Sequence, residues 1–112
     1  MKTTDAIQSL AALAQATRLD IFRLLVQKGT DGLAATAIAE KLGLPNATLS
    51  FHIKGLTQAG LVNARQDGRF IYYAANYPAM NSLVAFLTEN CCGGEGCGVA
   101  CEPVKPAKRK SA

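Results

Sequence analysis

The stretch AIAEKLGLPNATLSFHIKGLTQAGLV, residues 37–62, decides the fold. Its first part indicates a short helix over 34–42 that ends at Gly43, because glycine is often the residue just past a helix C-terminus. The turn at 44–46 then leads into a second helix, predicted over about 47–59. Two short helices joined by a tight turn that contains glycine are typical of a helix-turn-helix motif.

Two further helices are predicted before this motif. Apolar residues at the i, i+3, i+4, i+7 spacing predict an amphipathic helix over 4–14. Thr17, followed three residues later by Asp20, resembles a capping box and predicts that a second helix begins there. That helix should continue to Gly29. Its apolar residues cover more than one face, which is typical of a helix at the centre of a core.

A hairpin and a last helix are predicted after the motif. The β-prone runs 61–65 and 69–74 flank Gln66-Asp67-Gly68, and an Asp-Gly pair in that place indicates a hairpin. Pro78 suits the first turn of a helix that should reach about Asn90. The chain is therefore predicted to be mainly α, with about five helices and a two-stranded wing, in the order of a winged helix-turn-helix.

The composition fits one small domain followed by a basic tail. Of 112 residues, 49% are hydrophobic and 18% are charged, which suits a single core. We expect a domain over residues 1–90 and a flexible tail over 91–112. The net charge of +4 is shared between these two parts, so it is weak evidence for a nucleic-acid partner. No apolar run suits a membrane span or a signal segment, so we expect a cytoplasmic protein without a membrane partner.

All four cysteines, Cys91, Cys92, Cys97 and Cys101, belong to the tail. Because the domain has none, a disulfide framework for its fold is excluded. In a reducing compartment, such a cluster indicates soft-metal, metalloid or redox chemistry.

The helix predicted over 47–59 has an outward face suited to double-stranded DNA. At 100° per residue, Leu49, Ile53 and Leu56 form one buried stripe. Side chains opposite this stripe would face the major groove, where hydroxyls suit base edges, a phenyl ring suits a thymine methyl and an ammonium suits a phosphate. Together with two arginines of the hairpin, the predicted contact residues are Asn46, Thr48, Ser50, Phe51, His52, Lys54, Gln58, Arg65 and Arg69. The alternative is a solvated helix face, and for His52 a hydrogen-bonded structural role is at least as good an interpretation.

Three segments resemble the ArsR/SmtB family of bacterial metalloregulatory repressors. They are ATRLDIFRLL (16–25), AIAEKLGLPNATLSFHIKGLTQAGLV (37–62) and the wing RQDGRFIYYA (65–74). The resemblance implies a homodimer that occupies its operator when free of inducer and leaves it when a metal or metalloid binds. Apolar stripes on the first and last helices are predicted to form the dimer interface, through Ile7, Leu10, Met80, Leu83, Val84 and Leu87.

The sequence departs from two inducer sites that are common in this family. Residues 34–37, at the start of the motif, contain no thiol, and the last helix contains no His or Asp. Some arsenic-responsive members of the family carry a vicinal Cys pair and a third Cys just beyond the last helix. The four cysteines of the tail resemble that arrangement. The resemblance therefore implies As(III) or Sb(III) as the inducer, with no permanent cofactor.

Three thiolates suit a trivalent metalloid, which is thiophilic and three-coordinate. The shorter loop from Cys92 favours Cys97 over Cys101 as the third ligand, because it contains Gly93, Gly94 and Gly96 and orders fewer residues. The predicted ligands are Cys91, Cys92 and Cys97, with Cys101 as the alternative third ligand. Adjacent cysteines suit tetrahedral zinc poorly. Repressors that sense Cd, Pb or Zn, or that sense oxidants or persulfides, remain alternatives on the same fold.

The residues indicate no enzyme, because the sequence has one His, no Gly-rich phosphate loop and no convincing acid and base pair. A cysteine-based reductase would need a thiol in a concave site beside a base. A metallochaperone would keep the thiols but would not need a recognition helix and a wing.

Overall fold

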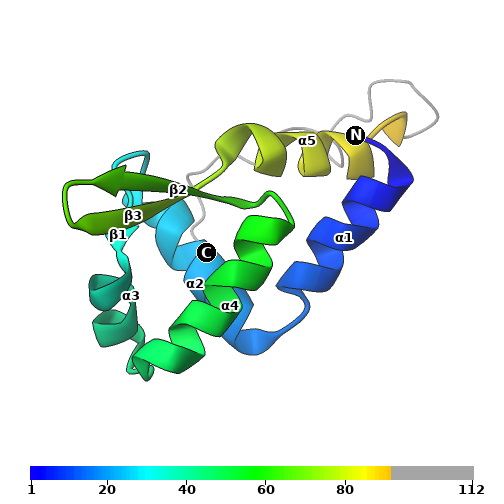
Figure 1. Cartoon of the computed structure of the whole chain (residues 1–112). Coiled ribbons are helices and arrows are strands. Elements are labelled where there is room, and N and C mark those ends of the chain that lie inside the picture. The colour runs from blue at the N-terminus through cyan, green and yellow to red at the C-terminus, as the bar shows by residue number, and fades with distance from the viewer. Residues whose placement is uncertain (92–112) are drawn as a thin grey trace.

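The computed structural model describes residues 1–91 of the chain. These residues form α1 (Thr3–Leu13), α2 (Ala16–Lys28), β1 (Leu33–Ala34), α3 (Ala35–Leu42), α4 (Asn46–Gln58), β2 (Val62–Asp67), β3 (Phe70–Ala75) and α5 (Tyr77–Leu87). Figure 1 shows α2 behind α4, the hairpin of β2 and β3 on the left, and α1 on the right below α5. The predicted winged helix-turn-helix is confirmed. None of the helices in this part of the chain is long and apolar enough to span a membrane.

The capping box predicted at Thr17 and Asp20 is wrong. Helix α2 begins at Ala16, so Thr17 lies inside its first turn. The extended residue before the helix, Gln15, accepts a hydrogen bond from the Arg18 amide at 2.8 Å. Its side chain therefore satisfies one of the amides that a helix N-terminus leaves without a partner. The predicted end of this helix at Gly29 is confirmed.

The hairpin has a tighter turn than predicted. Strands β2 and β3 pair from Val62 opposite Ala75 to Asp67 opposite Phe70, so the connection is residues 68–69 rather than residues 66–68. Gly68 has a φ of 64°. A glycine with positive φ at the first position of a two-residue loop suits the twist of the flanking strands, which lets pairing continue to Asp67.

A strand that the sequence did not predict completes the sheet. Strand β1 pairs antiparallel with β3, with Leu33 opposite Tyr73, and the strand order is β1-β3-β2. Two residues are too few for an alternating pattern, so only the packing of the chain defines this strand. Gly32, just before it, has a φ of 75° and lies against the backbone of Tyr73.

Helix α5 is shorter than predicted. Pro78 lies in its first turn, as expected, but the helix ends at Leu87 rather than near Asn90. The hydroxyl of Thr88 donates to the carbonyl of Val84 at 2.9 Å, and Asn90 adopts a left-handed φ of 56°. A side-chain bond to the preceding turn and a left-handed residue are both features that end a helix.

The core lies between α2, α3, α4 and the start of the hairpin. Burial of a leucine or isoleucine side chain contributes about 1.5–3 kcal/mol, so this cluster stabilises the domain. Its largest fully buried side chains are Ile21, Leu25, Ile38, Leu49, Leu56, Leu61 and Val62. Because α2 packs against α1, α3, α4 and β3, its predicted central position is confirmed.

Helices α1 and α5 pack on each other and leave apolar side chains exposed. Small residues of α1, Ala6, Ser9 and Ala12, face the interior. Leu83 is buried within the chain and Met80 packs against the core, so these two residues contribute to the protomer's own packing rather than to the outward surface predicted for them. The large apolar side chains that α1 and α5 expose are Ile7, Leu10, Val84 and Leu87.

We predict that Gly32→Ala destabilises the fold more than Gly43→Ala does. Both glycines have positive φ, 75° and 67°, where an alanine costs roughly 1–2 kcal/mol. At position 32 the new Cβ would also overlap the carbonyl oxygen of Tyr73, whereas at position 43 nothing lies within 4 Å. Urea unfolding should show an additional loss of about 1–3 kcal/mol for Gly32→Ala. Equal losses for the two variants would contradict the close approach of Gly32 to β3.

Candidate nucleic-acid interface

Helix α4 has one buried face and one outward face. Leu49, Ile53 and Leu56 are buried, as predicted from their spacing. Phe51 exposes 65% of its surface, so this phenyl ring has no role in the core. The predicted contact residues of the helix all lie outside the core: Thr48 and His52 are half-buried, while Asn46, Ser50, Phe51, Lys54 and Gln58 are exposed.

The hairpin lies directly beside this outward face. Ser50 and Lys54 of α4 line the same shallow hollow of about 330 Å³ as Ala64 of β2 and Tyr73 of β3. The structure therefore brings the predicted helix residues and the hairpin to one side of the molecule. A helix and an adjacent hairpin placed in this way could together contact a major groove and its flanking phosphates.

The two predicted arginines of the hairpin have different surroundings. Arg65 donates to the carbonyl of Asp31 at 2.9 Å, and its guanidinium carbon lies 5.1 Å from the centroid of the Tyr72 ring. Arg65 also lies 3.7 Å from the carboxylate of Asp67, in an exposed pair that adds little stability. Arg69 is exposed at the turn. Contacts within the chain therefore hold Arg65 in place, and Arg69 extends from the tip of the hairpin.

His52 has the hydrogen-bonded structural role that was one of its two interpretations, the other being a contact with DNA. Arg18 Nε donates to His52 Nδ1 at 3.1 Å. The guanidinium carbon of Arg18 lies 5.5 Å from the centroid of the Phe51 ring, and the rings of Phe51 and His52 meet edge to face at 5.2 Å. Arg18 was not among the predicted site residues, because no local pattern connects it with a histidine 34 positions later.

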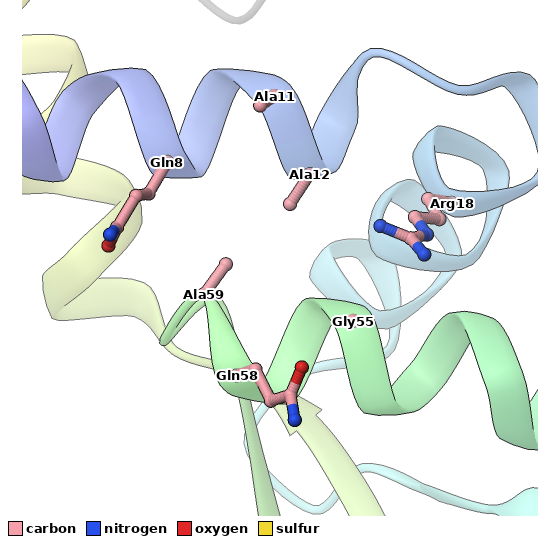
Figure 2. A pocket seen from close by; sticks show the side chains of 7 residues that line it. All are labelled: Gln8, Ala11, Ala12, Arg18, Gly55, Gln58 and Ala59. Carbon is pink, nitrogen blue, oxygen red and sulfur yellow. The ribbon is translucent and has the colours of Figure 1, made fainter.

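A shallow hollow of about 430 Å³ lies between α1, the start of α2 and α4. Figure 2 shows the Arg18 side chain reaching from α2 toward the middle of α4. The lining residues are Gln8, Ala11, Ala12, Arg18, Gly55, Gln58 and Ala59. None of these seven residues is a nucleophile or a general base, so the hollow itself offers no catalytic chemistry. A signal for this site was available in the sequence: Gly55 lies in the middle of a helix, where glycine is disfavoured.

Only Cys91 of the predicted thiol site lies in the described part of the chain, because Cys92, Cys97 and Cys101 lie outside it. The Cys91 amide donates to the carbonyl of Thr88 at 3.0 Å, which places this residue in the turn after α5. Its sulfur is disulfide-bonded in this structure. Within residues 1–91, no group of three or more His, Cys, Asp or Glu side chains is arranged to hold a metal ion.

The chain is similar to known regulators over most of the described residues. A family model described as a helix-turn-helix domain matches residues 13–65. The nodulation protein NolR of Rhizobium meliloti is 34% identical over 71% of this chain. The match spans 63% of NolR, which is less than two thirds of that protein's length. An uncharacterized HTH-type transcriptional regulator of Methanocaldococcus jannaschii is 33% identical, over 79% of this chain and 97% of that protein. The arsenical resistance operon repressor of Bacillus subtilis is 32% identical, over 76% of this chain and 77% of the repressor.

Solved structures show the same architecture. An ArsR-like transcriptional regulator from Rhodococcus sp. RHA1 superimposes with a TM-score of 0.68 at 26% identity, over 75% of this chain and 76% of that one. The homodimeric winged helix-turn-helix DNA-binding domain of Mb0332 from Mycobacterium bovis, described as a possible ArsR-family regulator, has a TM-score of 0.63 at 29% identity. The superposition covers 82% of this chain and 85% of that domain.

Proposed function

This chain belongs to the ArsR-like winged helix-turn-helix transcriptional regulators, which bind DNA. We propose that it is a homodimeric repressor and that As(III) or Sb(III) releases it from its operator. One observation carries the proposal. Helix α4 buries its apolar stripe and exposes Phe51 and Lys54, and Lys54 lines a hollow together with residues of the hairpin. The relatives are regulators, so we propose no catalytic role.

Helix α4 is the element proposed to enter the major groove. A helix with its side chains is about 10–12 Å across, which matches the width of that groove in B-DNA. In this position Phe51 would contact a thymine methyl, Ser50 and Thr48 would contact base edges, and Lys54 would contact a phosphate. Arg69, exposed at the tip of the hairpin, would contact the DNA backbone beside the groove.

A second copy of the chain is proposed to cover the exposed apolar side chains of α1 and α5. Ile7, Leu10, Val84 and Leu87 each expose between 42% and 59% of their surface in the single chain. Pairing of these helices about a twofold axis would bury them and place two copies of α4 about 34–36 Å apart, which is one turn of DNA. The homodimeric state of the Mycobacterium bovis domain supports the pairing of two copies.

The thiols are proposed to sense the inducer through the end of α5. Cys91 follows that helix by one turn, and Cys92 and Cys97, with Cys101 as the alternative third ligand, would complete a three-thiolate site in the reduced protein. Binding there would change the end of a helix that belongs to the proposed dimer interface. A hundredfold loss of operator occupancy needs only about 2.7 kcal/mol of preference for the DNA-incompetent state. The similarity to an arsenical resistance operon repressor supports this inducer class.

We predict that substitutions on α4 separate affinity from sequence preference. Lys54→Ala should weaken binding to every duplex and reduce the salt slope by about one for each protomer, because a phosphate contact is lost. Phe51→Ala, Ser50→Ala or Thr48→Ala should instead alter the preference among operator variants. Fluorescence anisotropy at several salt concentrations measures both quantities. If all four variants bind as the wild type does, α4 is not the recognition helix.

We predict that Val84→Glu converts the dimer to a monomer. A carboxylate buried in an apolar interface is strongly unfavourable, so the dissociation constant of the dimer should rise by at least about tenfold. Ser82→Glu is the matched control, because this exposed residue of the same helix lies about 200° away around the axis. Sedimentation equilibrium measures the association, and a dimeric Val84→Glu protein would rule out this face as the interface.

We predict that the thiols are needed for release but not for DNA binding. The variant with all four cysteines changed to serine should stay dimeric and operator-bound but no longer respond to arsenite. Among single variants, Cys91→Ser or Cys92→Ser should abolish release, Cys97→Ser should impair it strongly and Cys101→Ser should leave it near normal.

The assay is an operator gel shift on the reduced protein with the DNA upstream of its gene, titrated separately with arsenite, antimonite, cadmium, zinc and peroxide. A failing Cys101→Ser beside a responsive Cys97→Ser would reverse the assignment of the third ligand. Full release of the Cys91→Ser variant from the operator by arsenite would rule out the three-thiolate site. Release by cadmium, zinc or peroxide alone would replace the metalloid with one of the alternative inducers.

A further inference from the structure

We infer that Arg18 is a positioning residue for DNA recognition, which sets the orientation of Phe51 and His52 on α4 without contacting DNA itself. The inference rests on the proposed DNA-binding function and adds a residue from α2, outside the recognition helix and the hairpin. Two contacts of one guanidinium, together with the space that Gly55 leaves for it, carry the inference.

The first contact sets the tautomer and the ring orientation of His52. Arg18 has no acceptor atom, so its Nε can only donate, and it donates to His52 Nδ1 at 3.1 Å. In the neutral imidazole, an accepting Nδ1 requires the proton to be on Nε2. Arg18 therefore selects one tautomer of His52 and holds its ring in one orientation, with an N–H as the donor on the other side of the ring.

The second contact involves Phe51. The guanidinium carbon lies 5.5 Å from the centroid of this ring, within the range of a cation–π interaction. The ring also meets His52 edge to face at 5.2 Å and 68°. A side chain that exposes 65% of its surface has little other packing to restrain it. Arg18 thus holds both aromatic residues of α4 at once.

The third observation is the space that Gly55 provides. A Cβ at this position would lie 2.6 Å from Arg18 Cζ and 2.7 and 2.8 Å from its terminal nitrogens. Any other residue at position 55 would therefore displace the guanidinium. Glycine is disfavoured in a helix interior, and in α4 it leaves the room that Arg18 occupies.

The inference is tested with Arg18→Ala, Gly55→Ala and the double variant, with Arg23→Ala as the control, because Arg23 is an exposed arginine on the same helix. Gly55→Ala is the sharper variant, since it keeps the charge of Arg18 and favours the helix, and the three atoms nearest to the new Cβ all belong to the flexible end of the Arg18 side chain. Both single variants should bind the operator about tenfold more weakly, and the double variant no more weakly than either, because they remove the same contacts.

The pattern of loss distinguishes positioning from a direct contact. Both variants should change the preference at the same base pairs and leave the salt slope unchanged, and Arg18→Lys should not restore wild-type preference because it lacks the planar fork. A salt slope lowered by about one per protomer, with the base preference intact, would make Arg18 a phosphate ligand and overturn the inference. Wild-type binding by Gly55→Ala would also overturn it.

A measurement without DNA separates this inference from the proposed function. Nitrogen NMR of the imidazole at mildly alkaline pH should show His52 as the Nε2-protonated tautomer in the wild type and in Arg23→Ala. Arg18→Ala and Gly55→Ala should show a mixture of tautomers. A mixture in the wild type would refute the positioning role, whereas failure of the wild type to bind any upstream DNA would refute only the proposed function.

Discussion

The packing of α4 onto α2 is the contact on which the rest of the structure depends. Leu49, Ile53 and Leu56 of α4 join Ile21 and Leu25 of α2 in one cluster of buried side chains. Removing a single such side chain costs about 2–5 kcal/mol, a large share of the 5–15 kcal/mol by which a small domain is stable. One stripe of α4 is committed to this cluster, and the opposite face, with Phe51 and Lys54, lies in solvent. The surface that we propose for DNA recognition is thus a consequence of core packing.

The same cluster places the hairpin. Leu61 and Val62 follow α4 after a single turn, and both are fully buried, so the base of the hairpin is anchored in the core while its tip extends beyond it (Figure 1). The Asn76 side-chain amide donates to the carbonyl of Gly60 at 2.8 Å, across the junction where the chain enters the hairpin. The hairpin is therefore held at its base from both ends and stays beside α4.

Helix α5 connects this body to the cysteines. The hydroxyl of Tyr77 donates to the carbonyl of Val26 at 2.7 Å, which fastens the start of α5 to the end of α2. The far end of α5 lies against α1 and carries the exposed Val84 and Leu87. On the proposed mechanism, a change at Cys91 acts on the end of α5 opposite to the one that Tyr77 fastens to α2. Such a change would alter the orientation of one proposed protomer relative to the other without disturbing the core of either.

Local patterns in the sequence determined the order of the helices, the hairpin, the buried stripe of α4 and hence the candidate contact residues on its outward face. These features follow from spacing and turn chemistry within a few residues, which are properties of the sequence independent of any tertiary contact. Other features depended on the tertiary structure: the pairing of Leu33 with Tyr73, the burial of Leu83, and the contact of Arg18 with His52 over the space at Gly55. Each of these joins residues far apart in the chain or depends on which face of a helix its neighbours cover. No local period encodes such contacts, because they arise only when the elements pack together.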